Sequence, residues 1–246
     1  MTGKRPRVAV FRPDDERIDE AVELLEELGA KPVPDPMLAI EPTGATPRTD
    51  GDYTILTSKT GVELAADAGW EPGASELVAI GPSTAGAAEA AGFEVDLVPE
   101  EYTSAGLVAA LEERVEGKRV EVARSDHGSQ ILLDGLAAAG AYVHETVLYE
   151  LVIPEGAGES VDLAAAGDLD AALFTSSLTV EHFLTVARDR DIESEVRDGL
   201  LGAVIGAIGS PTAETAAAAG LTVDIVPGTA DFEALARAAI GELDQA

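Results

Sequence analysis

Short apolar runs alternate with longer amphipathic stretches along the 246-residue chain. Runs of strand length cover residues 8–11, 54–58, 77–81, 120–124, 171–176 and 203–209. Stretches of helical character end near a glycine and cover residues 20–29, 84–92, 106–117, 131–140, 180–190 and 212–220. Strands that alternate with helices predict an α/β fold built on parallel sheets flanked by helices.

The chain contains an internal repeat. The segment AIGPSTAGAAEAAGFEVDLVP, which starts at Ala79, returns from Ala207 as AIGSPTAETAAAAGLTVDIVP. ILTSKTGVE, from Ile55, has the counterpart LFTSSLTVE, from Leu173, and the segment from Val10 has a fainter one from Val122. The repeated units therefore run short, full, short, full, which indicates two similar domains.

Two pairings of these units into domains fit the pattern. In a sequential arrangement the chain divides near Lys118. In a nested arrangement the two middle units form one domain, and the N-terminal unit joins the last one. The extended, proline-containing stretches 31–42 and 145–156 are the candidate crossing points of the nested arrangement. The pattern alone leaves both pairings open.

Charge excludes some classes of function. The chain has 46 acidic and 16 basic residues, a formal net charge of −30, and the acids are dispersed over the helical stretches. We expect no nucleic-acid binding, because contact with phosphates requires a basic face. A dispersed acidic surface that repels itself at low salt indicates adaptation to a salty cytoplasm.

The remaining composition points to a cytoplasmic enzyme or binding protein without a metal. No apolar run approaches the roughly 20 residues that span a bilayer, and the N-terminal stretch lacks the apolar core of a signal peptide. There is no cysteine, which excludes disulfides and thiol catalysis. His127, His144 and His182 are too scattered to predict a metal site.

Taken in order, several motifs resemble the uroporphyrinogen-III synthase family over nearly the whole chain. They are VFRP from Val10, LTS at residues 56–58, IGPSTA from Ile80 followed by G-x-x-V-D-x-V-P, Ser104 before a leucine-rich helix, Arg124, Tyr149, FTSS from Phe174, and IGSPTA from Ile208. Each motif alone is common in α/β proteins. Their order, spacing and duplication together carry the resemblance.

The resemblance implies two similar α/β domains, each a parallel sheet flanked by helices, joined by a two-stranded linker with a cleft between them. It favours the nested arrangement, with domain 1 at residues 1–35 and 154–246, domain 2 at 41–149, and linker strands at 36–40 and 150–153. The implied enzyme is a monomeric hydro-lyase without a cofactor. It would cyclise hydroxymethylbilane, received from hydroxymethylbilane synthase, to uroporphyrinogen III, with loss of water and inversion of ring D, in tetrapyrrole biosynthesis.

The resemblance also selects the candidate site. Tyr149 is the catalytic candidate, a phenol that can hold the departing hydroxyl; the alternative is a packing tyrosine. The candidates for substrate binding are residues that end strands, open helices or carry a guanidinium. They are Arg12, Thr57, Ser58, Ser83, Thr84, Ser104, Arg124, Ser176, Ser177 and Thr212.

The residues themselves suggest how a polyanion is held. Ser58, Thr84, Ser176 and Thr212 are predicted near helix N-termini, where free N–H groups and the helix dipole attract carboxylates; the alternative is capping alone. Arg12 and Arg124 can bind carboxylates in a bidentate manner, or form surface ion pairs.

The sequence departs from the family pattern in places. Lys59 and Ser177 stand where proline is common after TS, and Gln130 stands where a basic residue is common. These changes put some substrate contacts in question. The alternative to the enzyme is a non-catalytic paralogue that binds a tetrapyrrole or another small ligand.

Overall fold

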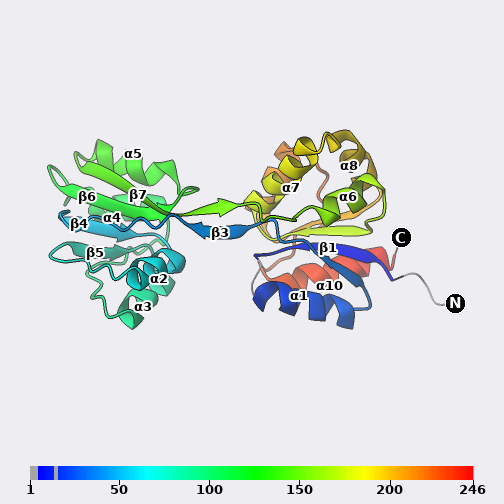
Figure 1. Cartoon of the computed structure of the whole chain (residues 1–246), viewed down its shortest axis with the longest axis horizontal. Coiled ribbons are helices and arrows are strands. Elements are labelled where there is room, and N and C mark those ends of the chain that lie inside the picture. Colours follow the sequence, from blue (N-terminus) through cyan, green and yellow to red (C-terminus); the bar gives the residue numbers. More distant parts are fainter. Residues whose placement is uncertain (1–4, 14–15, 246) are drawn as a thin grey trace. The chain divides into compact units, whose positions relative to one another are not determined.

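The structure is a computed structural model that describes residues 5–13 and 16–245 (Figure 1). Contacts divide the chain into two compact units. The first unit comprises the chain up to Ala39 and from Val152 onward, and the second comprises Ile40–Leu151. The second unit is therefore inserted into the first.

The first unit is built on a four-stranded sheet with the order β2-β1-β8-β9. Its three strand pairs are all parallel. The strands are β1 (Arg7–Phe11), β2 (Lys31–Pro34), β8 (Ala171–Phe174) and β9 (Val204–Ala207). The helices are α1 (Glu16–Glu27), α6 (Glu159–Ala165), α7 (Ser177–Asp189), α8 (Glu193–Leu200), α9 (Ser210–Ala218) and α10 (Phe232–Leu243). Strand β1 thus pairs with β8, which lies far away in the sequence.

Alternation along β1 supplies both faces of this unit with core residues. Val8 and Val10 pack with α1 and α10 on one face. Ala9 and Phe11 pack on the other face, with α6 and α7. There Phe11 stacks on Phe174 with ring centroids 4.5 Å apart. The fully buried strands therefore read as continuous apolar runs rather than as alternating ones.

The second unit is built on a five-stranded sheet with the order β3-β7-β6-β4-β5. Its strands are β3 (Ala39–Pro42), β4 (Tyr53–Leu56), β5 (Glu76–Ala79), β6 (Arg119–Ser125) and β7 (Tyr142–Val152). Its helices are α2 (Lys59–Asp67), α3 (Pro82–Ala90), α4 (Ser104–Leu111) and α5 (Gln130–Ala138). The pairs β4–β5, β4–β6 and β6–β7 are parallel. Strand β3 is added at the edge, so the chain enters this unit in β3 and leaves it at the end of β7 (Figure 1).

The internal repeat has a structural counterpart. The order β7-β6-β4-β5 in the second unit corresponds to β2-β1-β8-β9 in the first, and the repeated segments form equivalent strands and helices. In the second unit, α4 and α5 pack on one face of the sheet, and α2 and α3 pack on the other. The predicted α/β class is confirmed in both units.

Some predicted boundaries are wrong. The helix predicted over 106–117 ends at Leu111, because the chain then forms turns that bury Val115 in the core. The strand predicted over 54–58 ends at Leu56, because Ser58 already caps the next helix. Helices α2, α6, α8 and α10 were missing from the predicted helices, although Gly69 and Gly167 follow α2 and α6 in the left-handed conformation that is typical of helix ends.

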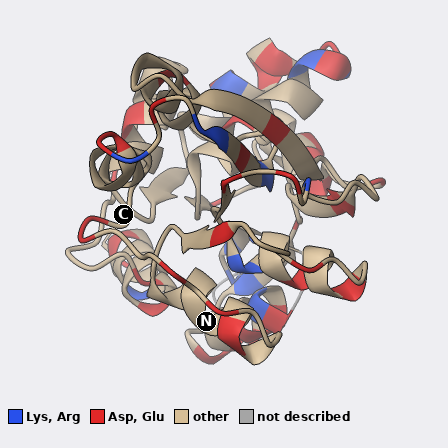
Figure 2. Ribbon diagram, turned by 90° about the vertical axis from the view of Figure 1, so that its left-hand side faces the viewer, with Lys and Arg blue, Asp and Glu red and all other residues tan. Residues whose placement is uncertain are grey.

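Acidic residues lie on helices and loops of both units rather than in a single cluster (Figure 2). Basic residues are fewer, and several of them are paired with acids, such as Arg197 with Glu193 at 2.6 Å. Within the described part of the chain, no helix is both long and apolar enough to span a bilayer.

Candidate functional site

The carboxyl ends of parallel strands gather most of the predicted site residues of the second unit at one edge of its sheet. Strands β4, β5 and β6 end at Leu56, Ala79 and Ser125, and they are parallel neighbours. Ligands of open α/β sheets bind at this edge. Thr57, Ser58, Ser83, Thr84 and Arg124 follow or end these strands, and Tyr149 lies in register with Ser125.

Tyr149 and Ser58 are brought into direct contact there. The phenol Oη of Tyr149 donates a hydrogen bond to Ser58 Oγ at 3.0 Å, across 91 residues of sequence. Ser58 is also the N-cap of α2, and its Oγ accepts from the backbone N–H of Gly61 at 2.9 Å. Tyr149 is 7% exposed and packs with Leu56 and Leu148. Its hydroxyl is therefore held at the N-terminus of a helix.

The other hydroxyl candidates of this unit have different positions. Helix α3 is capped by Gly81 without a side-chain bond, so Thr84 is a buried residue of the first turn and Ser83 is exposed. Ser104 lies inside α4, whose N-cap is Thr103. Thr84 is therefore not an N-cap residue, in contrast to the prediction. Thr103 is one and was not among the predicted caps, although threonine is a preferred N-cap residue.

Arg124 is buried and forms an ion pair, which matches the alternative given for it except that the arginine does not lie at the surface. Its side chain is 4% exposed, and Nε donates to Glu145 Oε1 at 2.6 Å. A second nitrogen donates to the carbonyl of Ser129 at 2.6 Å. A Cβ at Gly128 would lie 2.4 Å from Arg124 Cδ, so only glycine leaves room for this side chain. Arg124 thus stabilises the loop after β6 through its hydrogen bond to Ser129.

Arg12 occupies the equivalent position at the end of β1 in the first unit. Its guanidinium carbon lies 4.9 Å from the ring centroid of Phe232, within the range of a cation–π interaction. One of its nitrogens donates to the carbonyl of Arg17 at 3.3 Å. Arg12 and Phe232 line a cavity of about 390 Å³ beside the start of α10.

Ser176, Ser177 and Thr212 also follow carboxyl ends of strands in the first unit. Ser176 caps α7 through a capping box with Thr179, whose N–H donates to Ser176 Oγ at 3.2 Å. Ser177 Oγ donates to the carbonyl of Pro211 at 3.2 Å and so links α7 to α9. Thr212 is buried in the first turn of α9, which Gly209 caps without a side chain. Each unit therefore presents its own set of helix N-termini.

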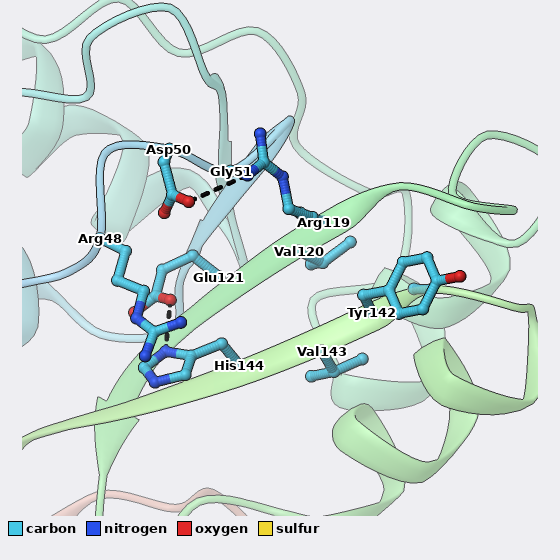
Figure 3. Close-up of a pocket in the computed structure, with 10 residues that line it drawn as sticks. Arg48, Asp50, Gly51, Arg119, Val120, Glu121, Tyr142, Val143 and His144 are labelled. Carbon is cyan, nitrogen blue, oxygen red and sulfur yellow. Dashed lines mark hydrogen bonds and ion pairs between the residues drawn. The ribbon is translucent and has the colours of Figure 1, made fainter.

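A separate cavity of about 430 Å³ lies at the opposite, amino edge of the second unit (Figure 3). Glu121, on its floor, is buried and pairs with His144 at 2.7 Å. Arg119, at its rim, pairs with Asp50 at 3.0 Å. Both acids therefore already have partners, and none of the predicted site residues lies there. The carboxyl edge that carries Tyr149 is therefore the better candidate site.

Asp126 adds a carboxylate to the edge with Tyr149. Burial raises the pKa of this carboxyl, but hydrogen bonds from His127 and from the backbone N–H of Leu151 outweigh it and lower the pKa below its ordinary value. Asp126 is thus an anion that serves as a hydrogen-bond acceptor. Among residues 5–13 and 16–245, no group of three or more His, Asp or Glu side chains is arranged to hold a metal ion.

Comparisons with known proteins agree on one family. The sequence profile described as "Uroporphyrinogen-III synthase HemD" matches residues 19–237. A protein of Methanothermobacter thermautotrophicus assigned as a uroporphyrinogen-III synthase is 36% identical over 221 residues, which cover 83% of this chain and 86% of the relative. A uroporphyrinogen-III synthase of Synechococcus elongatus is 28% identical over 175 residues, covering 68% of this chain and 66% of the relative.

Solved structures share the fold. A mutant uroporphyrinogen III synthase from the extremely thermophilic bacterium Thermus thermophilus superposes with a TM-score of 0.68 at 20% identity, covering 98% of this chain and 99% of that one. A uroporphyrinogen-III synthetase from Helicobacter pylori gives a TM-score of 0.58 at 16% identity, covering 97% of this chain and all of that one.

Proposed function

Because this chain belongs to the uroporphyrinogen-III synthase family of enzymes, we propose that it converts hydroxymethylbilane to uroporphyrinogen III. The reaction closes the linear tetrapyrrole, releases water and inverts ring D. The observation that carries the proposal is the hydrogen bond between Tyr149 and Ser58 at the carboxyl edge of a parallel sheet. No cofactor is required, since the hydroxymethyl group of the substrate already supplies the leaving group.

In the proposed reaction the bond from carbon to the departing hydroxyl breaks, and the hydroxyl leaves as water with a proton from the solvent. The same carbon forms a new bond to the terminal pyrrole ring, which returns a proton to the solvent, so that the net loss is one water. The phenol of Tyr149 is a weak acid at neutral pH, so its role is to position the departing hydroxyl rather than to drive the departure. Ser58 fixes the phenol, because its Oγ accepts both the phenol O–H and the N–H of Gly61. Most of the acceleration would come from holding the flexible bilane in the conformation that closes.

The polyanionic substrate would bind to helix N-termini rather than to a basic surface. Helices α2, α3, α7 and α9 all begin just after carboxyl ends of strands. Their free N–H groups and dipoles favour carboxylates, with Thr57, Ser58, Ser83, Thr84 and Ser104 as candidate ligands in the second unit, and Ser176, Ser177 and Thr212 in the first. Arg12 is the more accessible of the two arginine candidates, because it is half-buried and lines a cavity, whereas Arg124 is buried.

We further propose the two units as the domains of the enzyme. Residues 1–35 and 154–246 would form domain 1, residues 41–149 domain 2, and residues 36–40 and 150–153 the linker. The proposed enzyme is a cytoplasmic monomer that receives its substrate from hydroxymethylbilane synthase. Its product would feed tetrapyrrole biosynthesis.

Identification of the ring isomer tests the function. Hydroxymethylbilane closes spontaneously to isomer I, so isomer III reports catalysis directly. Purified protein in molar KCl, added to freshly made hydroxymethylbilane, should give isomer III in excess. Isomer I alone, together with binding of the porphyrin product, would instead support the non-catalytic binding protein. Heat-denatured protein is the matched control.

A further inference from the structure

Strand β7 carries an irregularity next to Tyr149. Its pairing with β6 shifts at this point: Arg124 is opposite Val147, but Ser125 is opposite Tyr149, so Leu148 is an extra residue. Successive residues of a regular strand face opposite sides of a sheet. Leu148 and Tyr149 instead pack into the same cluster, as expected at a β-bulge, which re-aims side chains. The bulge therefore explains why the Tyr149 ring faces α2.

A single residue holds β7 just after this bulge. The backbone N–H of Asp126 donates to the carbonyl of Tyr149 at 3.2 Å. The carboxylate Oδ1 of Asp126 accepts from the backbone N–H of Leu151 at 3.0 Å. Strand β6 ends at Ser125, so this carboxylate takes the place of the backbone carbonyl that would continue a parallel ladder. Asp126 thus forms hydrogen bonds with β7 at the residues before and after Glu150.

The state of Asp126 suits this role. His127 Nδ1 lies 2.9 Å from the same Oδ1. The lowered pKa of Asp126 keeps the side chain ionised at neutral pH, and an ionised acceptor forms the stronger hydrogen bond. These two hydrogen bonds also lie where the chain leaves the second unit, after Leu151. Without these two hydrogen bonds, the last residues of β7 would be attached less firmly to the end of β6.

We propose that Asp126 is a positioning residue for the reaction, which holds the bulged end of β7 so that the Tyr149 phenol stays on Ser58. This inference rests on the proposed function, since it assigns Asp126 a role only through Tyr149. Asp126 does not need to touch the substrate. Its effect passes through the backbone of residues 149–151 to the phenol.

A double-mutant cycle tests the coupling. Asp126→Ala, Tyr149→Phe and the double variant are compared by kcat and KM on fresh hydroxymethylbilane. Asp126→Ala should lower kcat by about tenfold, the effect of one charge-assisted hydrogen bond, with KM within about twofold. In the Tyr149→Phe background, the same change should cost less than about twofold. An equal loss in both backgrounds would overturn the inference, because Asp126 would then act independently of the phenol.

Two further variants sharpen the outcome. His127→Ala removes the imidazole but leaves both contacts with β7, so its kcat should remain near that of the wild type; a loss equal to that of Asp126→Ala would overturn the inference. If Asp126→Ala does not fold, Asp126→Glu moves the acceptor by one methylene group and replaces it in the cycle. Wild-type kcat in that variant would overturn the inference as well. Absence of isomer III with the unaltered protein would refute the proposed function instead.

Discussion

The hydroxyl of Tyr149 donates to Ser58 Oγ, which simultaneously caps α2 by accepting from the N–H of Gly61. The catalytic candidate and a helix N-terminus therefore share one oxygen atom. A phenol held in this way has a fixed orientation, and its partner cannot move without loss of the cap. The arrangement links the stability of a helix to the geometry of the proposed reaction.

Replacement of Ser58 should separate these two effects. Ser58→Ala removes the N-cap and should lower the free energy of unfolding by about 1 kcal/mol. It should also release the phenol and reduce kcat by roughly fivefold or more. Urea unfolding and steady-state kinetics measure the two changes.

Thr103→Ala is the matched control for this prediction. Thr103 caps α4 through the N–H of Gly106 at 3.0 Å, and α4 packs on the face of the sheet opposite to that of Tyr149. A similar loss of about 1 kcal/mol is expected, with kcat unchanged. Equal effects of the two variants on kcat would show that Ser58 acts only through stability.

Salt should stabilise the protein. Its net charge is −30, and repulsion among dispersed acids is relieved when molar salt shortens the Debye length to about 3 Å. Thermal melts in about 0.1 M and about 2 M KCl should show a higher midpoint at high salt. An equal or higher midpoint at low salt would contradict adaptation to a salty cytoplasm.

Acid should destabilise the protein over a defined range. Backbone bonding to Arg119 lowers the pKa of Asp52, and bonding to Arg197 lowers that of Glu193. Burial raises the pKa of Asp126, but its hydrogen bonds outweigh this effect and the net change is downward. A carboxyl whose pKa is lower in the folded state stabilises it above the unfolded pKa, which is about 4, and this contribution is lost as the pH falls through the folded value.

The free energy of unfolding, measured in urea from neutral to acidic pH at constant salt, should therefore fall below about pH 4. Asp126→Asn should reduce the slope in this range, because the side chain no longer binds a proton. A slope that stays unchanged in Asp126→Asn would contradict the lowered pKa of this residue.

The sequence predicted the sheets better than the details of the site. Strands such as β1 and β8 are continuous apolar runs, and the repeat aligned their carboxyl ends, so Ser58, Thr84, Ser176 and Thr212 were correctly placed near helix N-termini. The contact between Tyr149 and Ser58 could not be predicted, because it depends on a bulge whose extra residue leaves no mark in the hydrophobic pattern.

Arg124 shows a second limit of sequence reasoning. An arginine at the end of a strand is compatible with carboxylate binding and with an ion pair. The ion pair forms because Glu145 lies on the neighbouring strand and because Gly128 leaves room for the arginine. The position of Glu145 depends on the register of the sheet, and that of Gly128 depends on the course of the following loop. Neither can be predicted from a local sequence pattern.

The Tyr149 phenol is proposed to take part in the chemical step. Single-turnover kinetics of Tyr149→Phe on fresh hydroxymethylbilane tests it most directly, because this measurement separates chemistry from product release. One lost hydrogen bond in the transition state predicts a rate of isomer III formation about 5- to 150-fold lower, with normal folding and isomer III still the product. An unchanged rate of the chemical step in a folded variant would exclude this role and make Tyr149 a packing residue.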